Sequence, residues 1–233
     1  MRLNRFIGNF DLNQKEINIT DAEKIRQMKN VLKLKSGENV VLCDGKGTEA
    51  TCEILEIHKK GVVLEVKDLK KVGLDTTAKK VTLFCALAKK DSFELIVQKA
   101  TELGIYQIVP IITNRTVKTG VNMERLHKIA VEASEQSGRV DVPKIFEQIG
   151  FEKSLEMLQD FDTKILFEIG AQKFNKDDKK DKKNIAIFIG PEGGWTDKEK
   201  ELAKEFCVVE RSLVGNTLRV ETAAIVVVYE CVG

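Results

Sequence analysis

The chain has 233 residues, enough for one large domain or two small ones. Its 38 basic and 36 acidic residues nearly cancel, so nucleic acid would have to bind a local basic patch instead of a global field. The five cysteines include no C-x-x-C pair and are accompanied by only two histidines, so we expect no metal. Scattered cysteines, no signal-peptide pattern and no membrane-spanning apolar run predict a soluble cytoplasmic protein.

Residues 1–70 are predicted to form a small, mainly β domain. Thr20 and Glu23 make a capping box for a helix that we expect to end near Gly37. Three strands joined by tight glycine turns are predicted after it: 40–43, 49–57 and 62–66. Such short strands are typical of a small barrel. The basic side chains in this part suit either an ordinary solvated surface or contacts with RNA phosphates.

Residues 71–79 carry no strong pattern and are predicted to be a linker before a second domain, 80–233. There, strands and helices alternate, which is typical of a largely parallel sheet with helices on both faces. We expect two of the helices to follow caps at Asp91/Ser92 and Asn122. The predicted strands are 81–88, 105–112, 164–169, 185–189 and 207–211, and the other predicted helices are 151–158, 197–206 and 218–231.

Two segments of the second domain need separate interpretation. The lysine-rich stretch 173–183 is predicted to be a solvated, mobile loop without a catalytic role. Residues 225–228 have strand propensity, but the length of 218–231 favours a helix that is apolar nearly all round. A helix without a polar face predicts packing against a second copy of the chain, as in a homodimer.

One loop of this domain is rich in glycine. Strand 185–189 leads into residues 190–195, Gly-Pro-Glu-Gly-Gly-Trp, and Thr196 and Glu199 make a capping box for the next helix. The glycines let a ligand approach the backbone, the proline stiffens the entry, and the helix N-terminus offers free N–H groups. The loop therefore suits a small-molecule cradle, although a plain tight turn would use the same residues.

A second informative stretch, 212–223, follows the last predicted strand. Gly215-Asn216 is a turn pair, and Arg219 and Glu221 open the apolar helix, either as a structural ion pair or as part of a site. Because both loops follow strands of one parallel sheet, we expect them to face each other at its carboxyl edge, where α/β folds bind ligands. No P-loop, dinucleotide fingerprint or nucleophile elbow accompanies them.

These residues resemble a known family. The glycine loop 190–194 followed by Leu-Arg-x-Glu-Thr-Ala at 218–223 is similar to the C-terminal signature of SPOUT-superfamily RNA methyltransferases. More closely, the chain resembles the bacterial small-subunit rRNA uridine-N3 methyltransferase family, which it matches over essentially its whole length, including 99–104 and 135–139. The family usually has arginine where Asn216 stands and Leu-Gly at 213–214, and it often has arginine where Lys33 stands.

The resemblance implies a trefoil-knotted α/β (SPOUT) methyltransferase domain after an RNA-binding, PUA-like β-barrel domain. It also implies a homodimer that binds S-adenosylmethionine and acts on small-subunit ribosomal RNA or the assembled small ribosomal subunit. The cofactor-binding residues that it implies are Phe167, Ile189, Gly190, Pro191, Glu192, Gly193, Gly194, Ser212, Leu213, Val214, Gly215 and Leu218.

The implied reaction methylates N3 of one uridine. Arg219 is expected to stabilise charge on the flanking carbonyls or to hold the target phosphate, and Glu192 or Glu221 to accept the N3 proton or orient the base. Another RNA methyltransferase of the superfamily, acting on ribose 2′-O or another base, and a non-catalytic RNA-binding or ribosome-assembly protein are the alternatives. RNA contacts are expected from Arg2, Arg5, Lys29, Lys33, Arg115 and Arg139.

Overall fold

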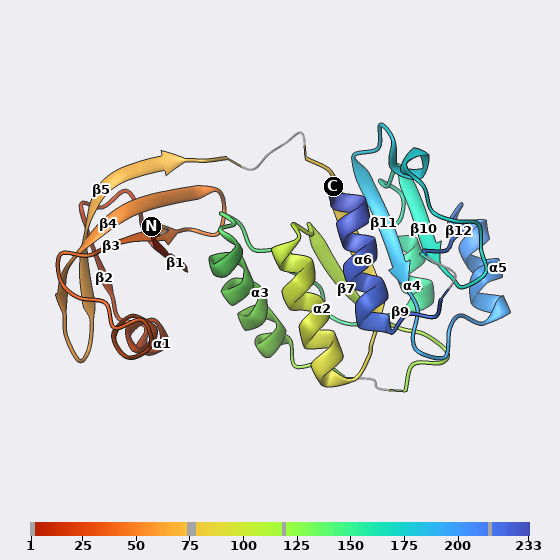
Figure 1. Ribbon diagram of the computed structural model, residues 1–233, viewed down its shortest axis with the longest axis horizontal. Helices are drawn as coiled ribbons and strands as arrows, with labels where there is room; N and C mark the ends of the chain where they lie inside the picture. Colours follow the sequence, from red (N-terminus) through yellow and green to blue (C-terminus); the bar gives the residue numbers. More distant parts are fainter. Residues whose placement is uncertain (1–2, 74–77, 118–119, 214–215) are drawn as a thin grey trace. The chain divides into compact units, whose positions relative to one another are not determined.

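The chain forms two compact units, which we describe separately. Figure 1 shows the computed structural model, which describes residues 3–73, 78–117, 120–213 and 216–233. Unit 1 contains Met1–Asp75 and Ser134–Val142, and unit 2 contains Thr76–Ala133 and Pro143–Gly233. We had expected residues 134–142 in the second domain, so the first unit is built from two separate stretches of the sequence.

Within residues 3–73, unit 1 is a sheet with one short helical segment, and residues 134–137 add the end of a helix that begins in unit 2. Its five strands lie in the order β1-β3-β4-β5-β2, with β1 parallel to β3 and the other neighbours antiparallel. Buried Phe6, Met28, Leu42, Ile54 and Leu64 form its core. The predicted glycine turns join β3 to β4 and β4 to β5. The strands are β1 (Asn4–Ile7), β2 (Glu16–Ile19), β3 (Asn39–Cys43), β4 (Thr48–Ile57) and β5 (Val62–Lys71).

The helix of unit 1 is shorter than predicted. Helix α1 (Ala22–Arg26) continues as one π-helical stretch, Gln27–Val31, and does not reach Gly37. Its N-cap is Asp21 instead of Thr20, because the Asp21 carboxylate accepts a hydrogen bond from the Lys24 amide at 2.8 Å. Beyond Val31, Lys33 adopts a left-handed backbone with φ of 53°, which is incompatible with a continuing helix.

A buried carboxylate connects residues 134–142 with the rest of unit 1. Glu135 is 7% exposed and accepts a hydrogen bond from the Ile7 amide at 2.8 Å. Its carboxylate lies 3.6 Å from Lys24 Nζ, and Gln27 donates to it at 3.3 Å. Since Lys24 Nζ also donates to the Ile7 carbonyl, Glu135 ties strand β1 to helix α1.

Unit 2 has the predicted parallel sheet. Its strands lie in the order β12-β10-β11-β6-β7-β8, every described pair is parallel, and β9 also pairs with β7. The strands are β6 (Lys80–Ala86), β7 (Gln107–Ile112), β8 (Lys144–Ile145), β9 (Ile149–Gly150), β10 (Thr163–Phe167), β11 (Asn184–Ile189) and β12 (Val209–Arg211).

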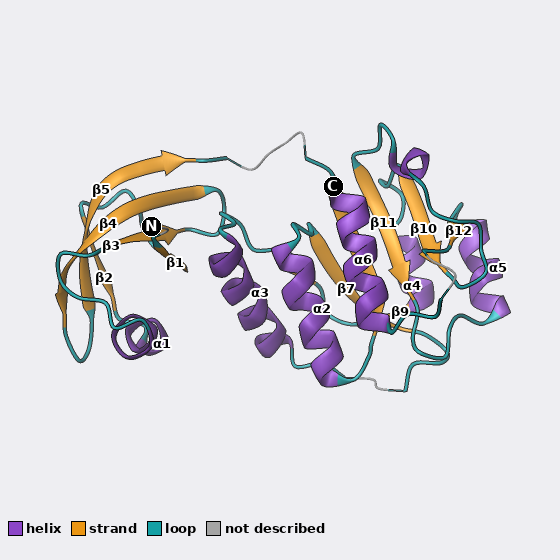
Figure 2. Cartoon of the chain, in the orientation of Figure 1, coloured by secondary structure: helices purple, strands orange, loops and turns teal. Residues whose placement is uncertain are grey.

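Helices cover both faces of this sheet (Figure 2). Helix α6 packs on α2, β6 and β11, whereas α4 contacts α5, β7 and β9. Because β12 is the edge strand and α6 lies over the middle of the sheet, the chain returns across the carboxyl ends of the strands between them. The helices are α2 (Lys90–Glu102), α3 (Met123–Ser137), α4 (Phe151–Glu156), α5 (Asp197–Glu205) and α6 (Val220–Val232).

The predicted helix caps have mixed outcomes. Asn122 accepts from the Arg125 amide at 3.0 Å, and Thr196 and Glu199 form the predicted capping box of α5. The cap at Asp91/Ser92 is wrong, because α2 begins one residue earlier. Its N-cap is Lys89, which makes no side-chain cap hydrogen bond.

The lysine-rich stretch is not simply a solvated loop. It contains the 3₁₀ turn Lys176–Lys179, and Lys179 is 9% exposed. The Lys179 ammonium donates to the carbonyl oxygens of Glu230 and Gly233, which the end of α6 leaves without intrahelical donors. Burial, followed by the charge of Lys79, lowers the pKa of Lys179. Among the described residues, no helix is both long and apolar enough to cross a membrane.

The cysteines provide a test of this packing. Burial raises the pKa of Cys52 to about 11 and that of Cys231 to about 12, and burial together with the Glu192 charge raises that of Cys85. Cys207 is exposed. We therefore expect iodoacetamide at pH 8 to modify Cys207 in the folded protein, with no adduct there after Cys207→Ser, as measured by peptide mass spectrometry. Rapid modification of Cys85 without denaturant would contradict the fold.

Candidate cofactor-binding site

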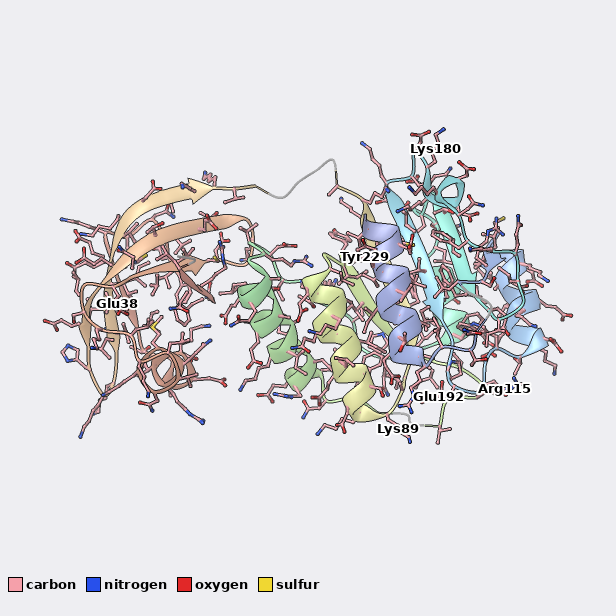
Figure 3. The ribbon with its side chains drawn as sticks, viewed as in Figure 1. Glu38, Lys89, Arg115, Lys180, Glu192 and Tyr229 are labelled. Carbon is pink, nitrogen blue, oxygen red and sulfur yellow. The ribbon has the colours of Figure 1, made fainter. Side chains whose placement is uncertain are left out.

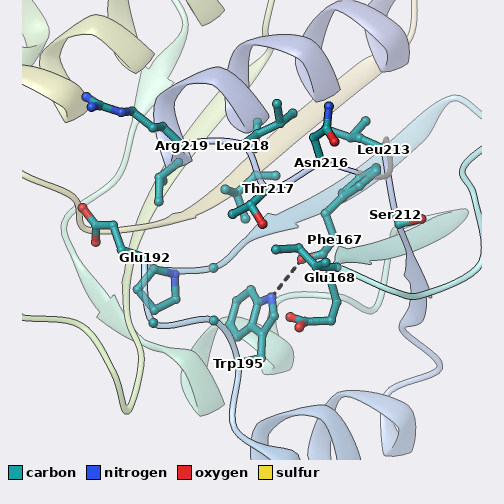
Figure 4. Close-up of a pocket in the computed structure, with 18 residues that line it drawn as sticks. Phe167, Glu168, Glu192, Trp195, Ser212, Leu213, Asn216, Thr217, Leu218 and Arg219 are labelled. Atoms are coloured by element: carbon teal, nitrogen blue, oxygen red, sulfur yellow. Dashed lines mark hydrogen bonds between the residues drawn. The ribbon is translucent and has the colours of Figure 1, made fainter.

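The two informative loops face each other at the carboxyl edge of the unit 2 sheet. They enclose, with the end of β10, a cavity of about 500 Å³ (Figure 4). That volume lies within the range of about 300–1,000 Å³ usual for small-molecule sites. The cavity is lined by Phe167, Glu168, Ile169, Ile189, Gly190, Pro191, Glu192, Gly193, Gly194, Trp195, Ser212, Leu213, Asn216, Thr217, Leu218, Arg219, Val220 and Ala223.

The glycines of the first loop are required for different reasons. A Cβ on Gly190 would lie 2.9 Å from the Trp195 ring, closer than real Cβ contacts. Gly194 has φ of +70°, a conformation that L side chains rarely adopt. A Cβ on Gly193 would lie 3.2 Å from Arg115 Cβ. The loop is therefore shaped by close packing and backbone conformation, which a plain turn does not need at all three positions.

Trp195 holds this loop in place. Its indole Nε1 donates to the carbonyl oxygen of Phe167 at 3.1 Å, and the side chain is 4% exposed. Its ring centroid lies 5.0 Å from that of Phe151 in the core. The indole thus joins the glycine loop to the end of β10 (Figure 4). We did not predict this residue as part of the site, although it directly follows the Gly-Gly pair and is the only tryptophan of the chain.

The second loop starts from Ser212, whose polar atoms are already bonded. Its amide donates to the Gln172 carbonyl, its carbonyl accepts from the Phe174 amide and its hydroxyl donates to the Ala171 carbonyl, each at 2.8 Å. Ser212 therefore lines the cavity while its main hydrogen-bonding groups fix the chain. Of the other predicted cofactor contacts, Val214 and Gly215 lie outside the described residues.

The lysine-rich stretch supports this second loop from behind. The Asp178 carboxylate, 8% exposed, accepts from Arg211 at 2.7 Å, directly before Ser212. Burial alone would raise the pKa of Asp178, but hydrogen bonds from Arg211 and from the Asn175 amide bring it below its ordinary value. Phe174, the second residue of this stretch, packs on the cavity residue Phe167 with centroids 5.6 Å apart.

Charged side chains stand at the mouth of the cavity. Arg219 is the N-cap of α6, its side chain is 88% exposed, and its Nη1 lies 4.0 Å from the Glu221 carboxylate. Such an exposed, long pair contributes little stability, so a structural ion pair does not explain these residues. Glu192 is also exposed and lies on the same side of the cavity as Arg219 (Figure 4). Glu221 is not among the residues that line the cavity.

The predicted RNA contacts fall into three groups. Three arginines are bonded within the protein: Arg5 to Glu49, Arg139 to Asp141, and Arg115 to the carbonyls of Gly193 and Trp195. Lys29 and Lys33 of unit 1 are exposed, and Arg2 lies outside the described residues. Besides Trp195, the cavity residues that were not predicted as site residues are Glu168, Ile169, Asn216, Thr217, Val220 and Ala223. Within the described part of the chain, no group of three or more His, Cys, Asp or Glu residues is placed to hold a metal ion.

The Asp178–Arg211 pair can be tested by one substitution. In Asp178→Asn, Arg211 loses its counter-charge, so we expect the free energy of unfolding to fall by roughly 1–3 kcal/mol and the affinity for S-adenosylmethionine to weaken. Denaturant unfolding and calorimetry measure the two effects. Asp177→Asn, on the same 3₁₀ turn but exposed, is the matched control and should change neither.

The same pair makes stability depend on pH. Because the pair depresses the Asp178 pKa, its contribution to the free energy of unfolding is present above the pKa of the unfolded carboxyl and is lost as pH falls through the folded value.

Known proteins match the chain over almost its whole length. A family model described as RNA methyltransferase domain matches residues 75–230, and one described as RNA methyltransferase PUA domain matches residues 19–67. Two relatives are named ribosomal RNA small subunit methyltransferase E. The Rickettsia conorii protein is 32% identical over 97% of this chain and 93% of its own length. The Bacillus subtilis protein is 32% identical over 87% and 84%.

Two solved structures share the fold. A putative methyltransferase from Legionella pneumophila with bound SAM has a TM-score of 0.88 and 26% identity, covering 98% of this chain and 96% of the other. Ribosomal RNA small subunit methyltransferase E from Neisseria gonorrhoeae, bound to S-adenosyl methionine, has a TM-score of 0.86 and 27% identity, covering 97% and 95%. The predicted fold class is confirmed: unit 1 is a PUA-like domain and unit 2 a SPOUT methyltransferase domain. The chain belongs to the ribosomal RNA small subunit methyltransferase E family.

Proposed function

We propose that this protein transfers a methyl group from S-adenosylmethionine to N3 of one uridine in small-subunit ribosomal RNA. The single observation that carries the proposal is the cavity between the two loops, which falls on the residues that the family resemblance assigns to the cofactor. The names of the relatives support the class of RNA, and the bound SAM of the two similar structures supports the cofactor. A cytoplasmic location, where ribosomal RNA is found, is part of the proposal.

The lining of the cavity suits an adenosyl cofactor. The cavity is lined by the glycine loop and by apolar Leu213 and Leu218, so backbone groups are at hand for the polar base edges and apolar side chains for the aromatic face. Phe167 closes the side formed by β10. The bound cofactor would supply the methyl group. The chain itself would contribute position, which is a large part of the rate of a displacement reaction.

The charged mouth of the cavity suits the proton chemistry of uridine. Loss of the N3 proton leaves negative charge on the two flanking carbonyl oxygens, and exposed Arg219 is free to approach that charge or the target phosphate. Glu192, on the same side, is placed to accept the proton or orient the base. Glu221 lies beside Arg219 and is the other candidate base. The target nucleotide would be turned out of its stack to reach this site.

The proposal includes a partner surface for RNA and one for a second copy of the chain. In unit 1, Lys29 and Lys33 are exposed and suited to phosphate contacts. In unit 2, the side chain of Tyr229 on α6 is 65% exposed (Figure 3). Ile225 and Val226, on the same helix, are half-buried. We propose that this face of α6 forms the homodimer contact, with sedimentation or mass photometry as its measurement.

The reaction is tested on ribosomal RNA that lacks the modification. We expect the purified protein and S-adenosylmethionine to produce 3-methyluridine in small-subunit RNA, identified by nucleoside mass spectrometry after digestion. Free RNA and assembled subunits from a strain lacking the enzyme are compared as substrates. Detection of a 2′-O-methyl nucleoside or of another methylated base would show that the protein methylates that group instead of uridine N3. Cofactor binding without methylation of either substrate would favour a non-catalytic RNA-binding role.

Arg219 is the sharpest residue to test. Arg219→Ala should lower kcat by about 10²–10³-fold, the usual cost of removing one group that stabilises transition-state charge. The affinity for S-adenosylmethionine should stay close to wild type, because the guanidinium points to solvent. Arg219→Lys keeps the charge without the planar fork and separates the two contributions. Unchanged turnover of the alanine variant would remove Arg219 from the chemistry.

A further inference from the structure

The loop that follows β7, residues 113–116, contacts the glycine loop but does not itself line the cavity. It is closed on itself by hydrogen bonds between Thr113 and Thr116. The Thr116 hydroxyl accepts from the Thr113 amide at 2.9 Å and lies 2.8 Å from the Thr113 hydroxyl, and the Thr116 amide donates to the Thr113 carbonyl at 3.1 Å. The loop is therefore a defined platform next to the site and not a loose connection.

Arg115 reaches from this platform to the backbone of the glycine loop. Its Nη1 donates to the carbonyl oxygen of Gly193 at 2.7 Å and lies 3.4 Å from that of Trp195. Its aliphatic stem covers Gly193 so closely that a Cβ there would lie 3.3 Å from Arg115 Cδ. Charge and packing thus act together on the two residues that flank Gly194. Figure 3 shows Arg115 and Glu192 at the same end of unit 2.

A buried carboxylate fixes the platform to the other side of the same loop. Glu199 is 8% exposed, and its Oε1 accepts from the Asn114 amide at 2.8 Å. Its Oε2 accepts from the amide and the hydroxyl of Thr196, both at 2.8 Å. The residue before Arg115 and the residue after Trp195 are therefore held by one carboxylate. Such a network makes the position of the arginine head group specific.

We propose that Arg115 is a positioning residue of the cofactor site, which fixes the backbone of Gly193–Trp195 in its binding conformation before the cofactor arrives. This inference rests on the proposed function and differs from the RNA phosphate contact expected from the sequence. A cradle whose contacts are backbone groups has no rotamers to adjust, so its affinity depends on how well that backbone is held in advance. Arg115 supplies that restraint from outside the cavity.

The single tryptophan makes the restraint measurable without any substrate. In ligand-free Arg115→Ala, we expect acrylamide to quench Trp195 more strongly than in wild type, because the loop that carries it is released. The dissociation constant for S-adenosylmethionine, from calorimetry, should rise about tenfold or more, since charge-assisted hydrogen bonds to the loop are lost. With saturating cofactor, kcat and the KM for RNA should change less than the cofactor affinity.

Two further variants make the test specific. Arg115→Lys keeps the charge on a stem one bond shorter and with a more strongly hydrated head group, so we expect it to resemble the alanine variant in quenching and cofactor affinity. Arg125→Ala removes the same charge from α3, where Arg125 pairs with Glu94, and should behave as wild type in both measurements. The comparison separates the loop restraint from general attraction between the protein and RNA.

Wild-type quenching and cofactor affinity in Arg115→Ala would overturn the proposal. A raised KM for RNA with those two values unchanged would assign Arg115 to phosphate binding instead. Wild-type cofactor affinity in Arg115→Lys together with stronger quenching of Trp195 would show that the charge sets the affinity without the loop restraint, and would equally contradict the proposal. Failure of the proposed reaction is separate from these outcomes, because it appears as absent methylation by the wild-type protein, whereas quenching needs neither cofactor nor RNA.

Discussion

The candidate site depends on the packing of one indole ring. Trp195 touches Gly190, lies against Phe151 in the core and donates to the carbonyl of Phe167, so the loop after β11 and the end of β10 meet on one buried side chain. A large, rigid ring with a single N–H has few alternative positions once that bond is made. The core below the loop therefore restrains its conformation, and a glycine is needed at position 190, where the chain passes over the ring.

The rest of the cavity is also held by side chains that lie outside it. Two of its walls are loops, and each loop is held by side chains that do not themselves line the cavity. Asp178 restrains Arg211 at the start of the second loop, and Arg115 restrains Gly193 in the first. Parallel pairing of β10, β11 and β12 brings the loops together, because all three strands end at the same edge. Supporting contacts of this kind decide how exactly a backbone cradle is shaped.

Local signals in the sequence predicted much of the fold. Strand periodicity, the Asn122 cap and the Thr196–Glu199 capping box depend on neighbours in the chain and were correct. The caps expected at Thr20 and Asp91/Ser92 were local errors. Two other errors occurred where distant residues decide: Lys179 is buried because α6 offers carbonyls to it, and 134–142 contact the rest of unit 1 through Glu135. The family resemblance located the two loops of the site. Trp195 was missed because its role depends on a carbonyl 28 residues away, and the individual cofactor contacts stay predictions.

The split composition of unit 1 has a consequence for the order of synthesis. When residue 75 has left the ribosome, every strand of that sheet exists, but the Ile7 amide and Lys24 still lack the carboxylate of Glu135. At about 5–20 residues per second, the intervening chain takes roughly 3–12 s to make. During that interval β1 is held by its pairing with β3 without the bond from Glu135. The first unit of the chain to be started is thus completed only after part of the second has been made.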